Sequence, residues 1–193
     1  FTTGGNTSLV GYWSSGTTIN GAGVVSETPA PDADNDVDSD DNGTRQTGAP
    51  FAGAVVSSAV TLGPSANEPT NDSDADATNP AGEAPNDQSN RTVDFGFYRV
   101  ELGDIVFVDV NNSGVYDAGD TLLAGATVQL YSSNGTEINV GPDGILGTPD
   151  DAPGGVTTIA NGSYLFSGLP AGDYIVKVTP PLGYVSTIDI DAD

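Results

Sequence analysis

Oxygen-bearing side chains recur at short, regular intervals between residues 109 and 120. The segment reads DVNNSGVYDAGD, and its positions one, three, five, nine and twelve are occupied by Asp109, Asn111, Ser113, Asp117 and Asp120. Gly114 stands at the sixth position, where a residue without a Cβ lets the backbone turn sharply. This is the spacing of the twelve-residue calcium loop of the EF-hand, whose seventh position, here Val115, contributes its backbone carbonyl. The pattern therefore predicts a Ca²⁺ site made of oxygen ligands.

Two interpretations of this loop remain open. Asp120 stands where the usual loop has Glu, so its shorter side chain would bind through one oxygen or through water. Asn, Asp and Gly also form hairpin turns by bonding side chain to backbone, so a turn without metal is the alternative. Residues 103–108 and 122–130 flank the loop with strand patterns rather than helix patterns. We expect the calcium loop without the helices of an EF-hand.

A second acidic segment lies at residues 32–41. Carboxylates recur there at every second position, which in an extended chain directs them to one side. Such a row repels itself unless a cation neutralises it, so the segment predicts a second calcium site. The candidate ligands are Asp34, Asp36, Asp38, Asp40 and Asp41. The alternative is a solvated, disordered acidic loop.

Two more acidic loops follow the same logic. The segment 68–76 offers Asn71, Asp72, Asp74 and Asp76, and the segment 141–151 offers Asp143, Asp150 and Asp151 around two glycines. At both, a bound cation and a tight loop without metal are open alternatives.

The charge balance is strongly acidic. Twenty-seven acidic residues stand against four basic ones, for a formal net charge of -23. Such an excess destabilises a compact state by self-repulsion unless counter-ions are bound. Nucleic acid and anionic membrane surfaces are disfavoured as partners, because binding them requires the missing Lys and Arg. No apolar run is long enough to span a membrane, so we expect no membrane insertion.

The chain contains no cysteine and no histidine. Disulfides, thiolate metal sites and nucleophilic catalysis of the Ser-His or Cys-His kind are therefore excluded. An acidic protein saturated with calcium suits the outside of a cell, where that ion is plentiful. We expect an extracellular or cell-surface location. Since Phe1 is not an initiator Met, we also expect a processed or partial chain.

Many short strand-like segments with turn residues between them predict an all-β sandwich without significant helix. The expected strands are residues 9–13, 23–28, 54–62, 92–100, 103–108, 126–131, 156–159, 162–166 and 173–179.

Three of these segments carry specific expectations. Residues 54–62 are apolar and β-branched, which predicts a buried strand. Residues 92–100 alternate, which predicts a buried face formed by Val93, Phe95 and Phe97. Residues 126–131 alternate in the same way, with Val128 and Leu130 directed inward.

Several segments closely resemble the calcium-binding B repeats of serine-aspartate-repeat surface adhesins, which have a B-type collagen-adhesin-like fold. The segments that carry the resemblance are GDIVFVDVNNSGVYDAGD, GATVQLY, TTIANGSYLFSGLPAGDYIVKVTPPLGYVST, DADNDVDSDDNGT, VSSAVTL, EPTNDSDAD and RTVDFGFY. The resemblance implies an immunoglobulin-like β-sandwich of the Greek-key type, several bound Ca²⁺ per repeat, and an extracellular stalk or matrix role.

The order of these segments is reversed relative to the family, in which the calcium-loop strand opens a repeat and VDFGFY closes it. We therefore expect residues 1–98 to be the C-terminal half of one sandwich, residues 99–101 an inter-domain linker, and residues 102–193 the N-terminal half of the next. Joining Asp193 to Phe1 of the next copy completes one repeat. Identical copies would then form a head-to-tail filament, either as covalent tandem repeats or by exchange of strands or half-domains.

Some members of the broader fold carry an internal crosslink from a lysine. Lys177 is the only lysine here, and it lies in the segment 173–179 rather than in the opening strand. We expect no such bond and interpret Lys177 as a surface partner of a carboxylate.

Three classes of function are weighed. The first is a structural repeat of an extracellular filament or cell-surface stalk, rigidified by calcium. The second is an adhesin module that binds a surface or matrix ligand, with Tyr12 and Trp13 as candidate contacts. The third is a hydrolase with paired carboxylates, which is disfavoured because no carboxylate lies in an apolar segment that would raise its pKa. We expect a structural protein and no enzyme.

Overall fold

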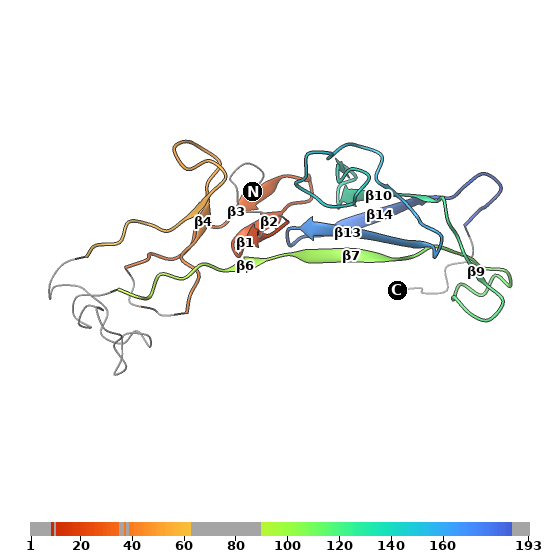
Figure 1. The fold of residues 1–193 in the computed structure, drawn as a ribbon, viewed down its shortest axis with the longest axis horizontal. Helices are drawn as coiled ribbons and strands as arrows, with labels where there is room; N and C mark the ends of the chain where they lie inside the picture. Colours follow the sequence, from red (N-terminus) through yellow and green to blue (C-terminus); the bar gives the residue numbers. More distant parts are fainter. Residues whose placement is uncertain (1–8, 10, 35–36, 38, 63–89, 187–193) are drawn as a thin grey trace. The chain divides into compact units, whose positions relative to one another are not determined.

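The computed structural model describes residue 9, residues 11–34, residue 37, residues 39–62 and residues 90–186 (Figure 1). The described chain contains strands and turns but no α-helix, which confirms the predicted all-β class. Accordingly, the described residues contain no helix that could cross a membrane.

The strands of the first hundred residues are short: β1 (Trp13–Ser14), β2 (Thr17–Ile19), β3 (Val25–Glu27), β4 (Thr44–Arg45), β5 (Val55–Val56) and β6 (Phe97–Tyr98). The later strands are β7 (Val100–Ile105), β8 (Phe107–Val108), β9 (Thr121–Leu122), β10 (Thr127–Ser132), β11 (Glu137–Ile138), β12 (Val156–Thr157), β13 (Ser163–Leu169) and β14 (Tyr174–Thr179).

Two compact units divide the chain. The larger unit is drawn from Phe1–Tyr12, Ile19–Val25 and Arg99–Asp193, and the smaller unit from Trp13–Thr18 and Ser26–Tyr98. The predicted half-repeats, residues 1–98 and 102–193, stay a prediction, because completion of a repeat depends on a second copy.

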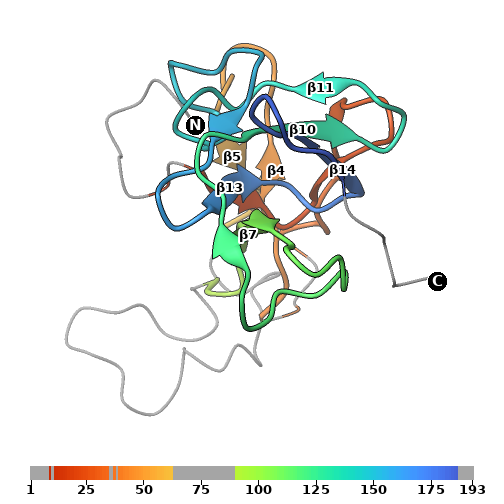
Figure 2. The same ribbon diagram turned by 90° about the vertical axis from the view of Figure 1, so that its right-hand side faces the viewer.

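The first sheet of the larger unit is built around β10 (Figure 2). β14 pairs with β10 along its whole length, from Thr127↔Thr179 to Ser132↔Tyr174. β11 pairs with one end of β10 and β12 with the other. A strand has two edges, and β14 occupies one of them completely. β11 and β12 therefore share the opposite edge of β10.

The second sheet pairs β13 with β7 in antiparallel orientation. The other edge of β13 receives the excursion between β11 and β12, through a parallel bridge between Ile145 and Ser167. Leu146 N–H donates to the Ser167 carbonyl at 3.0 Å, and Ser167 N–H donates to the Gly144 carbonyl at 2.9 Å. Residues 139–155 thus connect the β11/β12 edge of one sheet to the β13 edge of the other and close that side of the sandwich.

The core of the larger unit lies between these two sheets. Its buried side chains are Ile19, Val128, Leu130, Ile138, Val140, Val156, Phe166 and Leu169. Val128 and Leu130 are fully buried, which confirms their predicted inward direction. Full burial of a Val, Leu or Phe side chain stabilises a fold by roughly 1.5–3 kcal/mol. The alternating pattern of β10 therefore fixes which face of the sheet carries the core.

The outer face of the same sheet carries Lys177. Its Nζ donates to Gln129 Oε1 at 3.2 Å and lies 5.8 Å from the centre of the Tyr131 ring. Gln129 in turn donates to Glu137 Oε1 at 2.9 Å. The predicted direct carboxylate partner is wrong: an amide stands between the lysine and the carboxylate, because Gln129 is the residue opposite Lys177 in the sheet.

The smaller unit consists of two-stranded pieces in its described residues, with β1 paired to β6 and β4 paired to β5. Within it, the Arg45 guanidinium lies over the Trp13 ring at 5.4 Å. An isolated parallel bridge joins Asp41 to Asp94. Neither of these two-stranded sheets is broad enough to cover both faces of a strand.

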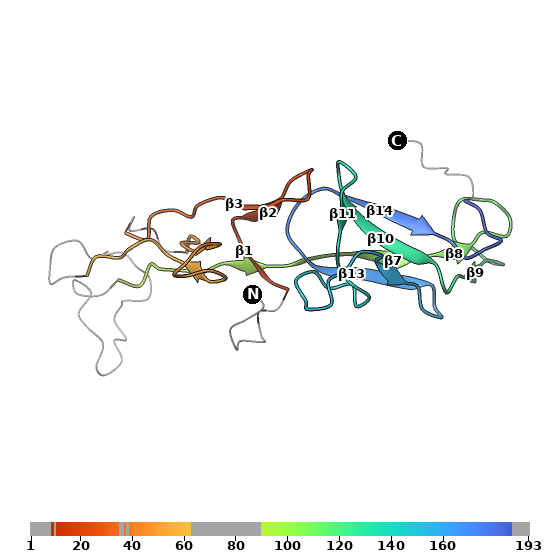
Figure 3. The same ribbon diagram turned by 90° about the horizontal axis from the view of Figure 1, so that it is seen from above.

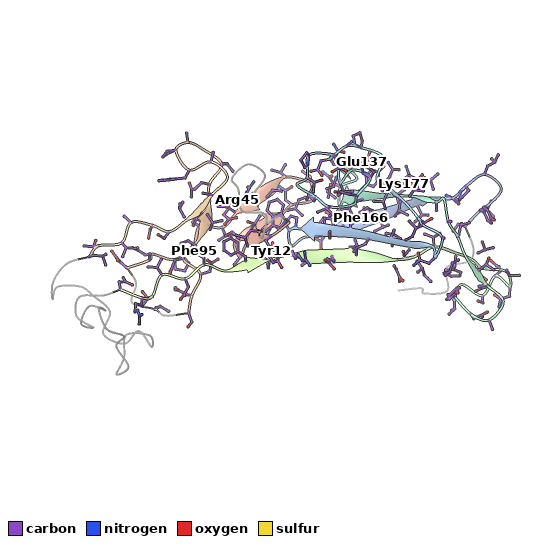
Figure 4. The ribbon with its side chains drawn as sticks, viewed as in Figure 1. Tyr12, Arg45, Phe95, Glu137, Phe166 and Lys177 are labelled. Atoms are coloured by element: carbon purple, nitrogen blue, oxygen red, sulfur yellow. The ribbon has the colours of Figure 1, made fainter. Side chains whose placement is uncertain are left out.

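Two expectations about the smaller unit are therefore wrong. The predicted buried strand 54–62 is reduced to the half-buried β5, and Leu62 is 68% exposed. Phe95, expected on a buried face, is 46% exposed (Figure 4). The physical reason is the same for both, because an apolar strand is buried only where another layer covers it.

The pH dependence of the melting temperature tests the burial of Tyr164. Burial, and to a lesser degree the negative charge of Asp104, raise the pKa of the Tyr164 phenol. The folded state then holds the phenolic proton more tightly than the unfolded state. The resulting stability is present below the unfolded pKa of about 10 and is lost as pH rises through the folded pKa. We expect the melting temperature of the wild type to fall more steeply above about pH 10 than that of Tyr164→Phe. Equal slopes in thermal melts across this range would contradict the assignment.

Candidate metal centre

The candidate calcium loop lies between two paired strands. β8 and β9 are antiparallel, with Phe107↔Leu122 and Val108↔Thr121 in register, so the loop they enclose is residues 109–120 (Figure 3). This confirms the prediction that strands flank the loop. Gly114 has a φ of 78°, a conformation that favours glycine, as its place at the sharp turn requires.

The first and last carboxylates of the loop accept backbone hydrogen bonds. Asp109 accepts from Ser113 N–H at 3.0 Å and from Gly114 N–H at 2.8 Å. Asp120 accepts from Val110 N–H at 3.0 Å and from the N–H of Asp117 at 2.9 Å. The bonds of Asp109 hold the start of the loop to its turn, and the bond from Val110 to Asp120 holds the two ends of the loop together.

The remaining predicted ligands contact one another. Asn111 Nδ2 donates to both carboxylate oxygens of Asp117 at 3.2 Å. Ser113 Oγ donates to the Val115 carbonyl at 3.0 Å and lies 3.4 Å from Asp117 Oδ2. The fold thus brings together all six residues that the spacing selected.

The donor set fits Ca²⁺ by its chemistry. It offers three carboxylates, an amide oxygen, a hydroxyl and a backbone carbonyl, which are the hard ligands that this ion takes. In the part of the chain that the structure describes, no three acidic side chains are arranged as a metal-binding cluster. The loop carboxylates are instead engaged by the loop's own donors.

The segment 32–41 is not extended throughout, because the described chain turns at residues 33–34 and bends at residues 39–40. The calcium site predicted there stays a prediction. Asp34 accepts from Thr61 N–H at 3.0 Å, and Asp40 accepts from Asn42 Nδ2 at 3.1 Å. Asp41 Oδ1 accepts from the N–H groups of Gly43 and Gly96, both at 2.9 Å. Asp36 and Asp38 lie outside the described residues.

Sequence reasoning missed Asn42 and Asp94 in this region. Asn42 is buried, and its side-chain oxygen accepts the Asp94 N–H at 2.9 Å. Asp94 Oδ2 accepts from Ser39 N–H at 2.9 Å. The two residues join the acidic segment to the strand that ends in β6. Asn42-Gly43 after two aspartates is a turn signal that could have drawn attention to this position.

The loop 141–151 does gather its predicted residues. Thr148 Oγ1 lies 2.5 Å from Asp150 Oδ1 and 3.4 Å from Asp151 Oδ1. The Thr148 hydroxyl holds the pKa of Asp150 below its usual range, with a smaller contribution from Asp143. Asp143 Oδ1 also accepts from Ile145 N–H at 2.8 Å, next to the bridge onto β13. Thr148 was not among the predicted residues, because a lone Thr carries no metal signal.

The fourth candidate group, Asn71, Asp72, Asp74 and Asp76, lies outside the described residues.

Comparison with known proteins finds a family match in the second half of the chain. Residues 100–192 match the SdrD B-like domain. No solved structure matches the chain significantly.

The curated relatives are long proteins. The chain is 35% identical over 105 residues to serine-aspartate repeat-containing protein F of Staphylococcus epidermidis, and 37% identical over 105 residues to protein I of Staphylococcus saprophyticus. It is 38% identical over 103 residues to protein D of Staphylococcus aureus strain Newman. These matches cover 52 or 53% of this chain but only 5 to 7% of each relative.

The SdrD B-like domain contains two of the four candidate sites, the loop 109–120 and the loop 141–151. The acidic segments 32–41 and 68–76 lie outside the matched residues. The loop 109–120 is therefore the candidate that combines ligand spacing, a closed strand pair and a place within the family domain.

Proposed function

We propose that this chain is a calcium-stabilised structural repeat of an extracellular filament or cell-surface stalk. The observation that carries the proposal is the loop between β8 and β9, in which six oxygen donors with calcium-loop spacing lie together. The formal net charge of -23 supports this proposal, because bound cations would offset the repulsion between carboxylates that otherwise opposes the compact state.

Asp109, Asn111, Ser113, Val115, Asp117 and Asp120 would hold the ion. When bound, Ca²⁺ supplies positive charge and takes six to eight oxygen ligands. The hydrogen bonds of Asp109 and Asp120 hold the loop closed, so its oxygens are already close together. The Asn111 amide and the Ser113 hydroxyl contact Asp117 and would turn their oxygens to the ion. Further ions are proposed at the segment 32–41, the segment 68–76 and the loop 141–151.

The surface location and the assembly are part of the same proposal. The curated relatives are serine-aspartate repeat-containing proteins, and this chain spans a small share of their length, as one repeat would. Identical copies are the proposed partners, joined head-to-tail as covalent tandem repeats or by exchange of half-domains. No nucleic acid and no membrane insertion is involved.

A structural role is favoured over the two other classes. Tyr12 and Trp13, the candidate adhesive contacts, are half-buried, and each ring faces an arginine of its own unit, Arg99 at 5.2 Å and Arg45 at 5.4 Å. The printed names of the curated relatives, serine-aspartate repeat-containing proteins, state no enzymatic activity.

Asp117→Asn tests the loop directly. Among the described residues, the Asp117 carboxylate accepts hydrogen bonds from the side chains of Asn111 and Ser113 and from no backbone N–H, so the substitution removes a charge without removing a backbone bond. We expect the calcium affinity of this site, measured by titration calorimetry, to fall at least about tenfold, or about 1.4 kcal/mol.

Asp173→Asn is the matched control, since it removes the same charge from an exposed position outside the candidate loops. A calcium isotherm that is the same for Asp117→Asn, Asp173→Asn and the wild type would reject the site.

A further inference from the structure

A cavity of about 560 Å³ lies at one end of the larger unit. Figure 1 and Figure 3 show β9 and the turn after β14 at this same end. The apolar residues that line the cavity include Ile105, Phe107, Leu123, Tyr164, Val178 and Tyr184. Asp109 and Asn112 of the candidate calcium loop also line it. A space of this size, with a mostly apolar lining, suits an apolar occupant.

Val178 shows that the cavity is a gap in the core. Val178 of β14 is opposite Val128 of β10, and residues that are opposite in an antiparallel pair share a face. Val128 is fully buried, but Val178 is 41% exposed and lines the cavity. Val176, two residues earlier on the same face, packs against the core cluster. The core-facing surface of β14 is therefore covered at Val176 and open at Val178.

The chain after β14 turns back along this cavity. Tyr184 N–H donates to the Pro181 carbonyl at 3.3 Å, and Gly183 between them has a φ of 103°. A positive φ at the third residue is what a type II turn requires, and such a turn reverses the chain. Pro180, before the turn, and residues 183–186, within and after it, line the same cavity. The chain thus lies against the cavity again just before residue 187.

The residues that follow have the pattern of a strand with one apolar face. Residues 187–193, which lie outside the described residues, read TIDIDAD, so Ile188 and Ile190 alternate with Asp189 and Asp191. In an extended chain, alternate side chains share one side, which would place the two isoleucines together. Ile188 is two residues beyond Ser186 of the cavity lining, and an extended chain advances about 3.3 Å per residue. Both isoleucines can therefore reach the cavity.

The candidate calcium loop forms the charged part of the cavity wall. Asp109 begins the loop and lines the cavity, and the loop also holds the carboxylates of Asp117 and Asp120. The segment 187–193 carries three more carboxylates. Carboxylates that come this close repel one another, and a bound Ca²⁺ would offset the repulsion. Calcium should therefore favour the approach of the segment, and by reciprocity the segment should favour calcium.

We propose that residues 187–191 seat Ile188 and Ile190 in this cavity, and that Ca²⁺ in the loop 109–120 strengthens the seating. The two side chains would leave water and cover Val178, Leu123 and Tyr164, which fills the gap in the core. The calcium part of this inference rests on the proposed function. Bound Ca²⁺ would then rigidify the segment after β14 as well as its own loop.

Nuclear Overhauser effects test the seating in the full chain. Isoleucine methyl groups and tyrosine rings are labelled, and cross-peaks from Ile188 or Ile190 to the Tyr164 ring are expected in saturating Ca²⁺. Ile175 is the internal control, because it is exposed on the outer face of β14, opposite Tyr131, and should give no cross-peak to Tyr164.

Two results of this experiment would overturn the seating. One is the absence of cross-peaks to Tyr164 from both Ile188 and Ile190. The other is a set of cross-peaks that disappear on dilution, because a second copy would then fill the cavity.

Calorimetry tests the link to calcium. Ile188→Ser/Ile190→Ser should weaken Ca²⁺ binding at the site that Asp117→Asn affects by at least about fivefold. Ile159→Ser/Ile175→Ser is the matched control and should leave the affinity unchanged, because both isoleucines are exposed and lie outside the cavity lining. Equal affinities of the wild type and the two double variants would overturn the link.

Repeating both measurements in excess chelator separates this inference from the proposed function. The cross-peaks to Tyr164 should weaken in chelator, and equal intensities would overturn the link to calcium. Calcium binding that Asp117→Asn weakens, without any cross-peak to Tyr164, would overturn the seating and keep the calcium site. Cross-peaks in a wild type that binds no Ca²⁺ would keep the seating and reject the calcium role.

Discussion

Removal of calcium with excess chelator is expected to lower the melting temperature of this protein by roughly 10–20 °C. A ligand that binds only the folded state stabilises it by about 2.7 kcal/mol at a hundred times its dissociation constant. In a domain of 60–100 residues, each kcal/mol shifts the melting temperature by about 4–8 °C. The family domain of residues 100–192 falls in this size range. Differential scanning calorimetry with and without chelator gives the shift directly.

The control for this experiment is Asp117→Asn. If the loop between β8 and β9 holds the ion, this variant should have a lower melting temperature in calcium than the wild type. Chelation should also lower its melting temperature by less than it lowers that of the wild type. Readdition of Ca²⁺ should restore the wild-type melting temperature, and Mg²⁺ should restore less of it, because Mg²⁺ needs near-ideal octahedral geometry. Unchanged melting of the wild type in excess chelator would contradict the proposed function.

Phe166→Ala is expected to destabilise the larger unit by about 3–5 kcal/mol. Phe166 is fully buried on β13, and it packs in the cluster that contains Val128 and Leu130 of the facing sheet (Figure 4). Truncation leaves a cavity between the two sheets, and the paired strands around it limit relaxation. Urea unfolding followed by circular dichroism should show a lower midpoint with an unchanged slope.

Leu165→Ala is the matched control on the same strand. Leu165 precedes Phe166, points to the opposite face and is half-exposed. Its truncation should cost about 1 kcal/mol or less. Similar losses for the two variants would mean that β13 does not separate a core face from a solvent face.

Features that depend on neighbours in the chain could be predicted from the sequence. The loop 109–120 was found from ligand spacing and from Gly114, whose positive φ is a local property of a tight turn. The strand β10 followed from alternation, and β14 from a strand-like segment bounded by turn residues. The inward direction of Val128 and Leu130 followed from the same pattern, because a period of two assigns side chains to faces wherever a strand forms.

The acidic segments were harder to predict. In the segment 32–41, spacing alone predicted a shared direction for the carboxylates, and turns send Asp34, Asp40 and Asp41 to different partners. Two of those partners, Thr61 and Gly96, are distant in sequence. Hydrogen bonds of this kind are invisible to a pattern that counts neighbours.

The sequence by itself determined the residue types of the candidate calcium loop, the all-β class and the faces of β10. Only the tertiary structure decided which of those faces are covered: Phe166 is buried, whereas Phe95 and Val178, equally apolar, are not. The reason is physical, since apolar surface leaves water only where a second layer lies against it. Whether such a layer exists depends on how strands distant in the chain are paired.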